Sequence, residues 1–82
     1  PVLDGRGEFL EFMAISGSRI TDKPIKETNF PRGANICAVL GSNGAYVPRG
    51  DDVIYGGDRV VVFTTPALRA RVEHAFQKRR LL

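Results

Sequence analysis

The stretch Arg59-Val60-Val61-Val62-Phe63-Thr64 is the densest run of β-branched residues in the chain. Residues of this kind fit the pleated, half-buried surface of a sheet. The glycine-rich segment Gly56-Gly57-Asp58 comes just before it and predicts a tight turn. We therefore expect residues 59–64 to form a central strand of a sheet.

The segment after this strand is expected to form the final helix. Thr65 is suited to the N-cap position, and Pro66 is suited to the first helical position. Four apolar residues then recur at helical spacing and form one stripe: Leu68, Val72, Ala75 and Phe76. The charged residues of this segment lie away from the stripe, so we expect an amphipathic helix packed on the sheet.

Further strands are predicted upstream. Glu8–Ile15 is apolar on both alternating faces, which indicates a strand covered on both faces or one face against a partner subunit. Asn35–Leu40 is the next strand, and Asn43-Gly44 favours a hairpin leading into Ala45–Val47. Val53–Ile54 predicts only a brief extended piece.

Residues 20–31 predict one or two helical turns between the first two strands. Thr21 or Asp22 can cap such a helix, and Pro24 is tolerated only in its first turn. The residues expected to face the core are Ile25 and Phe30.

The resulting order, β-α-β-β-β-α with short connections, indicates an α+β domain with a mostly antiparallel sheet and helices packed on it. Its 82 residues suit one domain. We expect residues 1–7 to be a linker from an upstream domain, residues 8–77 to be the domain itself, and residues 78–82 to be a basic tail. Because the chain starts at Pro1 without a Met, we expect it to be part of a longer protein.

The formal net charge of +3 is concentrated near the C-terminus, because residues 69–82 carry +4 and residues 1–68 carry −1. One interpretation is a patch for nucleic acid or an anionic membrane. The other is that cations gather at a helix C-terminus, where the helix dipole favours each by ~0.3–1 kcal/mol. No aromatic residue alternates with these bases as a stacking platform. We therefore favour the second interpretation and expect no nucleic acid partner, and a nucleic-acid-binding module is the alternative function.

The sequence offers few groups for catalysis. Cys37 and His74 are the only residues of their types, which excludes an intramolecular disulfide and a Cys/His zinc site and suits a reducing compartment. We expect Cys37 to be buried and inert, and His74 to be exposed or structural. Asp51, Asp52 and Asp58 flank turns, where aspartate bonds nearby amides. Phosphate-loop, dinucleotide and nucleophile-elbow motifs are missing from the sequence, so we expect neither an enzyme nor a bound cofactor.

The longest apolar run, residues 36–40, has five residues, whereas a membrane helix needs ~20. The sequence therefore predicts no membrane-spanning segment. A domain below ~80 residues is marginally stable on its own, so we expect it to pair with a second copy.

Four ordered segments resemble the TrkA C-terminal domain family, also called the C-terminal subdomain of regulators of potassium conductance. Ser18–Ile25 is similar to a family segment with a Ser, an apolar pair, a Gly-Lys and a Leu, although Asp22 stands where the family has Gly. Phe30–Ile36 is similar to its Leu-Pro-x-Gly-x-x-Ile. Val47–Asp51 is similar to its apolar-Pro-x-Gly-Asp, and Ile54–Val62 is similar to its Leu-x-x-Gly-Asp-x-apolar run. The resemblance lies in the order and spacing of these segments and covers about residues 8–77.

The resemblance implies a regulatory domain of a potassium transport protein on the cytoplasmic face of the membrane. Such a domain follows a Rossmann-type nucleotide-binding domain or a membrane domain, forms a homodimer, and relays the binding of a small effector to a channel or transporter. The residues expected to line a pocket at the dimer interface are Arg32, Asn35 and Ile36. The residues expected to shape turns are Gly33, Pro48, Gly50, Gly57 and Asp58.

Overall fold

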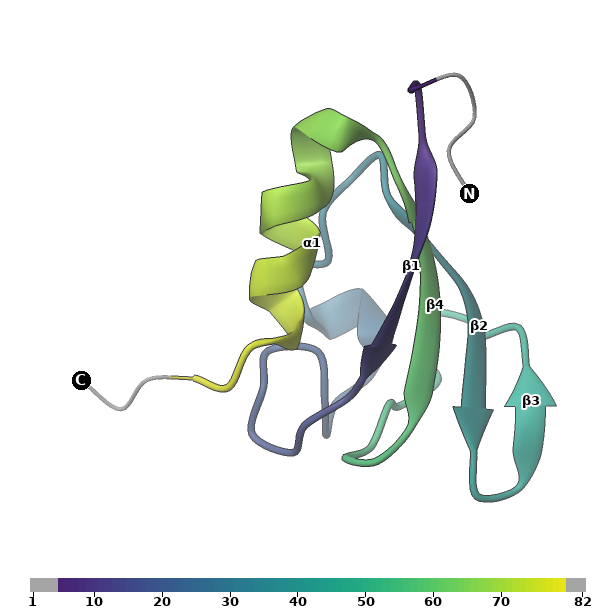
Figure 1. The fold of residues 1–82 in the computed structure, drawn as a ribbon. Coiled ribbons are helices and arrows are strands. Elements are labelled where there is room, and N and C mark those ends of the chain that lie inside the picture. The colour runs from purple at the N-terminus through teal and green to yellow at the C-terminus, as the bar shows by residue number, and fades with distance from the viewer. Residues whose placement is uncertain (1–4, 80–82) are drawn as a thin grey trace.

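The computed structural model describes residues 5–79 and shows a four-stranded antiparallel sheet with one α-helix packed on one face (Figure 1). The elements are β1 (Glu8–Met13), η1 (Ile25–Glu27), β2 (Asn35–Gly41), β3 (Gly44–Tyr46), β4 (Arg59–Thr64), η2 (Pro66–Leu68) and α1 (Arg69–Phe76), where η denotes a 3-10 helix. The predicted α+β class is confirmed. Within residues 5–79, no helix has the length and apolar character needed to cross a membrane.

Strand β4 lies in the middle of the sheet, as its β-branched run predicts. The strand order is β1-β4-β2-β3, with β4 antiparallel to both neighbours. Val60, Val62 and Thr64 are fully buried, whereas the alternate residues Val61 and Phe63 are half-buried. The strand therefore presents apolar side chains to both faces of the sheet, and only one face is sealed.

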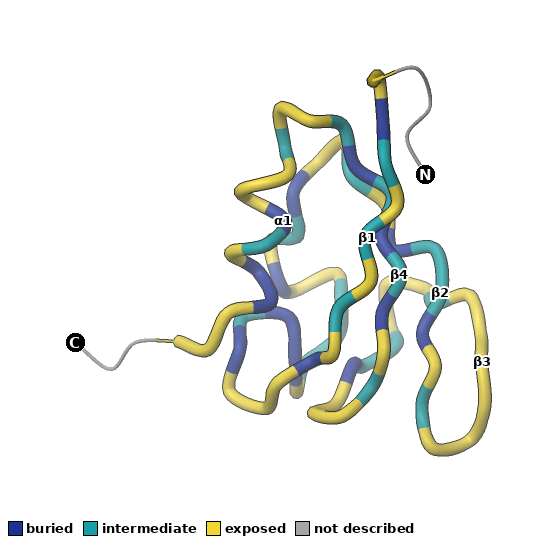
Figure 2. The backbone as a smooth tube through the Cα atoms, in the orientation of Figure 1, coloured by how far each residue is buried: buried dark blue, intermediate teal, exposed yellow. Residues whose placement is uncertain are grey.

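The core lies between this sealed face and α1. Phe76 stacks against Phe12 of β1, with ring centroids 4.2 Å apart and planes within 2° of parallel. Phe30 meets the edge of the same Phe76 ring at 6.5 Å. The fully buried Ile20 and Ile54 complete the cluster from the loops. Figure 2 shows these buried positions along the inner side of the backbone, with β3 exposed along its length.

The predicted apolar stripe of the final helix is confirmed. Val72, Ala75 and Phe76 are buried, and Leu68 is half-buried. The helical segment opens with the 3-10 turn η2 before α1 begins. Thr65 starts it through an extended backbone, with φ −82° and ψ 157°, rather than through a side-chain hydrogen bond.

The prediction for residues 20–31 is wrong in its details. The helix is a single 3-10 turn, η1, and Pro24 precedes it with a non-helical ψ of 138°. Thr21 does not cap it, because its hydroxyl hydrogen bonds to the carbonyl oxygens of Ile15 and Ser18. Asp22 instead accepts hydrogen bonds within the preceding loop, and its φ of 71° fits the glycine that the related family has at this position.

Strand β1 forms an edge of the sheet. Within the described residues only one of its faces is covered, so of the two interpretations of its sequence, cover on both faces by this chain is wrong. Its burial alternates strictly, with Phe9, Glu11 and Met13 on the exposed side. The brief piece at Val53 and Ile54 bridges to Pro24 and Thr21 rather than joining the sheet.

The hairpin between β2 and β3 forms as predicted, with a shift of one residue. Ser42 and Asn43 make the loop, and Gly44 alone takes a positive φ, at 109°. The outer parts of the predicted linker and basic tail, residues 1–4 and 80–82, lie outside the described residues.

Candidate functional site

Four residues singled out in the sequence meet at one small cavity of about 210 Å³. Asn35 and Ile36, at the start of β2, form one side, and Pro48 and Gly50 form the other. The remaining lining residues are Ile25, Phe30, Ala34 and Arg49. The fold thus brings together two segments that are separated in the sequence by the entire β2–β3 hairpin.

The turn before β2 determines where Asn35 lies. The Ala34 amide donates to the Pro31 carbonyl at 3.3 Å, which closes a turn around Gly33. Gly33 has a φ of 94°, and a Cβ atom there would lie 2.8 Å from the Cδ1 atom of Leu68. Glycine is needed at this position both for its backbone conformation and for the close approach of η2.

The opposite wall is held against η1 by backbone hydrogen bonds. The Lys26 amide donates to the Gly50 carbonyl, and the Ile25 amide donates to the Asp52 carbonyl, both at 2.9 Å. Gly50 is not among the glycines with a positive φ, so its turn does not require the left-handed backbone. Its role is close approach, because a Cβ atom there would lie 3.3 Å from the Cβ atom of Lys26.

Two polar contacts fix the outside of this wall. The Arg49 amide donates to Asp52 Oδ2 at 2.7 Å, which is the predicted aspartate turn. Lys26 Nζ lies 2.5 Å from Asp51 Oδ1 in an exposed ion pair. This hydrogen bond raises the pKa of Lys26 and lowers the pKa of Asp51.

The lining of the cavity is divided about evenly between polar and apolar surface. Ile25, Phe30 and Ile36 supply hydrophobic surface, and Asn35 supplies an amide. Arg49 adds a cation that the sequence analysis missed, although it lies inside the quoted segment Val47–Asp51. Such a site can hold a small molecule by apolar contact and orient it with one amide and one guanidinium.

Cys37 and His74 take no part in this cavity. Cys37 sits at a β-bulge between Ile36 and Ala38, half-buried rather than buried as expected, and its Sγ lies 3.7 Å from the side-chain nitrogen of Asn35. His74 is exposed on α1. Among residues 5–79, no group of three or more His, Cys, Asp or Glu side chains is placed to hold a metal ion.

Arg32 lies apart from the other two predicted pocket residues. It lines a neighbouring groove of about 750 Å³ that shares Ile25 and Phe30 with the Asn35 cavity. Arg71 of α1 lines the same groove. Arg32 could therefore reach only a ligand that extends past Phe30.

Gly57 and Asp58 shape a turn outside this site. The Tyr55 amide donates to Asp58 Oδ2 at 3.0 Å, and Gly57 has a φ of 92°. The Ala14 amide donates to the Asp58 carbonyl at 2.7 Å, which joins the end of β1 to the start of β4. Their role in the described structure is to set the register of these two strands.

Comparison with known proteins shows the family. The family model of the TrkA-C domain matches residues 9–77, so the chain belongs to this family. It is 39% identical over 72 residues to the Trk system potassium uptake protein TrkA homolog 1 of Methanosarcina mazei, covering 88% of this chain and 16% of that protein. It is 34% identical over 76 residues to the Trk system potassium uptake protein TrkA of Azorhizobium caulinodans, covering 93% of this chain and 17% of that protein. The chain thus spans about a sixth of the length of these two relatives.

Proposed function

We propose that this TrkA-C domain is a non-catalytic regulatory domain of a potassium transport protein at the cytoplasmic face of the membrane. It pairs with a second copy through its outer sheet face and binds a small effector at the Asn35 cavity. The homology to Trk potassium uptake proteins supports a role in potassium transport. The apolar outer face of the sheet supports the pairing and is the observation on which the proposal depends.

The outer face, on the side of the sheet away from α1, is defined by the strand register. Phe9, Met13 and Leu40 are 43%, 56% and 44% exposed, although apolar side chains of this size normally favour burial. Phe9 packs edge-on against Phe63, with centroids 5.3 Å apart. The cross-strand pairs on this face are Phe9↔Phe63, Glu11↔Val61, Met13↔Arg59, Ala38↔Val61 and Leu40↔Arg59.

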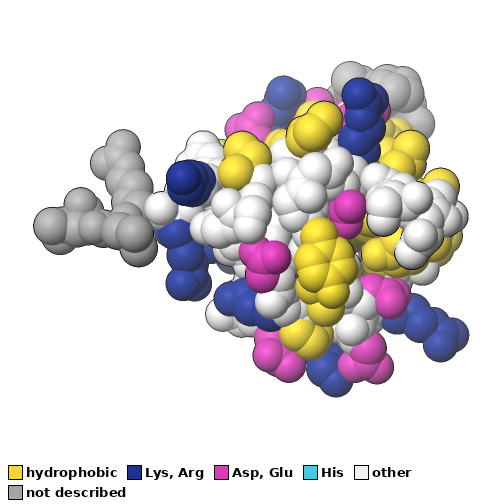
Figure 3. Space-filling model, turned by 90° about the horizontal axis from the view of Figure 1, so that it is seen from below, with side chains coloured by type: hydrophobic (Ala, Val, Ile, Leu, Met, Phe, Trp, Pro, Cys, Tyr) yellow, Lys and Arg dark blue, Asp and Glu magenta, His cyan; other side chains and the backbone are white. Residues whose placement is uncertain are grey.

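The charges on the outer face favour a second copy as the occupant. Glu11 and Arg59 form an ion pair at 3.1 Å, so the two charged groups offset each other. A neutral apolar face is self-complementary in a twofold dimer, where the same patch is used by both subunits. Figure 3 shows exposed hydrophobic side chains at several places on the surface seen from below, with Lys, Arg, Asp and Glu side chains between them.

The effector cavity adjoins this face. Asn35 pairs with Phe63 in the register of β2 and β4, so both side chains belong to the outer face, whereas Ile36 turns inward opposite Val62. A ligand that contacts Asn35 therefore lies beside the proposed dimer seam. Different affinities of the ligand for two arrangements of the dimer would be enough to relay its binding.

Light scattering after size exclusion tests the pairing. We expect the chain at high micromolar concentration to show twice its mass of 9.0 kDa. The double variant Phe9→Ser/Met13→Ser is expected to run as a monomer. The control Tyr55→Ser removes a side chain that is 58% exposed but lies off the sheet, and it should remain dimeric. A monomeric unmodified chain would contradict the proposal.

Potassium uptake tests the relay. The matching segment of the Methanosarcina mazei TrkA homolog 1 is replaced by this chain, and uptake is measured in cells that lack their own system. We expect the chimaera to support uptake, and Asn35→Ala to change its regulation without abolishing dimerisation. Equal uptake with and without the inserted domain would show that the domain does not regulate transport.

A further inference from the structure

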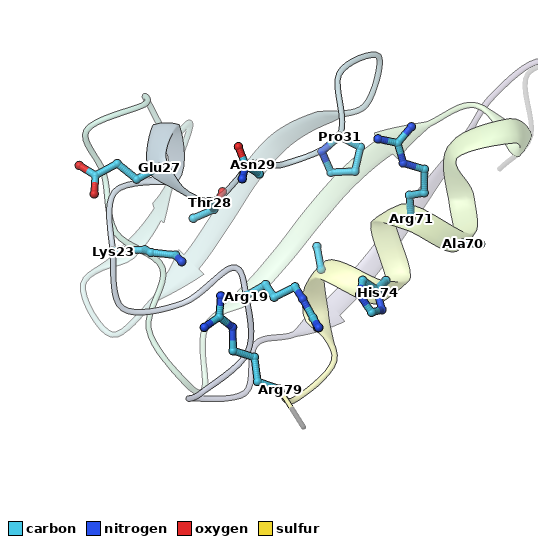
Figure 4. Close-up of a pocket in the computed structure, with 11 residues that line it drawn as sticks. Arg19, Lys23, Glu27, Thr28, Asn29, Pro31, Ala70, Arg71, His74 and Arg79 are labelled. Atoms are coloured by element: carbon cyan, nitrogen blue, oxygen red, sulfur yellow. The ribbon is translucent and has the colours of Figure 1, made fainter. Parts of the chain in front are cut away.

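A third cavity, larger than the Asn35 site, lies between α1 and residues 19–31 and measures about 570 Å³ (Figure 4). Arg71 and His74 line it from the helix, and Lys23 and Asn29 line it from the facing segment. We propose that this basic groove, which the regulatory function proposed above does not use, binds a small anion that contains a chain of phosphates.

The backbone brings the charges of this groove together. The Arg79 amide donates to the Gly17 carbonyl at 3.2 Å, and Ser18 and Lys78 form an isolated antiparallel bridge. These contacts hold the segment after α1 beside the loop that carries Arg19. As a result, Arg19 and Arg79, which are 60 positions apart in the sequence, line the same cavity.

The lining of the groove has a marked excess of positive charge. It contains four cationic side chains and one acid, Glu27. Figure 4 shows the Glu27 carboxylate directed away from the cationic groups. The four cationic side chains are Arg19, Lys23, Arg71 and Arg79.

These four cations differ in their partners from three other cations on the surface. Lys26, Arg59 and Arg69 each form an ion pair with a carboxylate. In the described part of the chain, none of the four groove cations forms an ion pair with an acidic side chain. Like charges held together without a counter-charge repel one another, so an anion bound here gains energy from all of them.

The shape of the groove favours a chain of phosphates over a single one. Figure 4 shows Lys23, Arg19 and Arg79 clustered at one end, with Arg71 toward the other. Guanidinium groups bind phosphate oxygens with paired hydrogen bonds, which makes arginine the suitable residue for this ligand. The volume falls within the ~300–1,000 Å³ typical of small-molecule sites. Ala70, Ala75 and Pro31 add an apolar wall on which a nucleoside could rest.

Isothermal titration of the whole 82-residue chain tests the proposal, with inorganic tripolyphosphate and ATP as separate probes. We expect tripolyphosphate to bind at low salt, with an affinity that falls steeply as sodium chloride is added. Equal affinity for both probes supports recognition of the phosphate chain alone, and tighter binding of ATP supports use of the apolar wall. Failure of both probes to bind would overturn the proposal.

Two charge-matched variants separate a built site from general attraction. Arg79→Gln should weaken tripolyphosphate binding at least tenfold, because it removes a guanidinium that lines the groove. Lys78→Gln is the control, since it removes the same charge from the adjacent residue, which does not line the groove. Equal losses in the two variants would overturn the proposal.

Further measurements exclude other causes of a loss of binding. Circular dichroism and the light-scattering mass are recorded on the same samples, so that a loss of folding or of dimerisation is recognised separately. Arg71→Gln on α1 provides a second variant at the far end of the groove, with the same expected loss. Tighter binding of a short single-stranded DNA that displaces tripolyphosphate would assign the groove to nucleic acid and overturn the proposal.

Discussion

The two faces of the sheet are built by the same strands but differ in what covers them. Beneath α1, Val60 and Val62 are fully buried, whereas Phe9 and Met13 on the outer face remain 43% and 56% exposed. Both faces are apolar because β1 and β4 carry hydrophobic residues at successive positions. A strand that is apolar on both faces therefore calls for packing partners on both sides of the sheet. In the described residues, this chain provides a partner for one side only, the helix α1.

The largest expected effect comes from opening the covered face. Phe76→Ala removes a ring that is 4% exposed and stacked on Phe12, and should lower the free energy of unfolding by ~3–5 kcal/mol. The matched control Phe9→Ala on the outer face should cost the monomer about 1 kcal/mol or less, because the ring is already partly in water. Urea denaturation followed by circular dichroism measures both. Equal losses would show that the two faces contribute equally to the stability of the monomer.

The next largest effect is expected at Gly33, in the turn before β2. This turn precedes Asn35 and Ile36, which lie on opposite faces of the sheet. Gly33→Ala should destabilise the domain by ~1–2 kcal/mol or more, because a Cβ atom at φ 94° is strained and would clash with Leu68. The control Gly44→Ala has a φ of 109° but meets no atom within 4 Å, so it isolates the backbone contribution. Thermal unfolding of both variants measures the difference. If Gly44→Ala costs as much, the close approach to Leu68 contributes nothing.

A smaller effect should come from the charge of the outer face. Glu11→Lys replaces the partner of Arg59 with a second cation, so the face acquires like charges in both copies of the proposed dimer. We expect the dimer dissociation constant to rise about fivefold, which corresponds to ~1 kcal/mol. Sedimentation equilibrium measures it, with Glu27→Lys as a control that makes the same charge change away from this face. An unchanged constant for Glu11→Lys would place the dimer seam elsewhere.

The smallest effect is expected from the exposed pair between Lys26 and Asp51, beside the Asn35 cavity. The pKa of Asp51 is lower in the folded chain than its ordinary value of 3.8, so the pair stabilises the fold above that pH. This stabilisation should disappear as the pH falls through the lowered pKa of the folded state. Comparing the acid unfolding of the unmodified chain with that of Asp51→Asn measures it. We expect the variant to lose more stability near neutral pH than at low pH, where Asp51 is protonated in both states. A loss that is equal at the two pH values, or larger at low pH, would contradict the assignment.

The elements with strong local patterns could be predicted from the sequence. The β-branched run of β4 indicated a central strand, and the spacing of Val72, Ala75 and Phe76 indicated the buried stripe of α1. The segment around Pro24 could not be predicted as well. Its conformation depends on bridges to Val53 and Ile54, which are distant in the sequence, rather than on its own helix propensity.

The candidate sites were likewise predictable only in part from the sequence. Asn35 and Ile36 were singled out from a motif, and Arg49 was overlooked because it has the character of an ordinary turn residue. The basic groove could not be predicted from the sequence, because it depends on a tertiary contact between residues 17–18 and residues 78–79. The sequence showed only that positive charge is concentrated near the C-terminus, without showing which cations come to face one another.

The sequence alone determined the class of the fold, the central strand and the apolar side of the helix, because each follows from patterns among residues within a few positions. Only the tertiary structure decided which apolar face of the sheet is sealed, which residues share the Asn35 cavity and which cations share the groove. Those outcomes depend on how distant segments pack, and the packing is selected by the burial of the whole core rather than by any local preference.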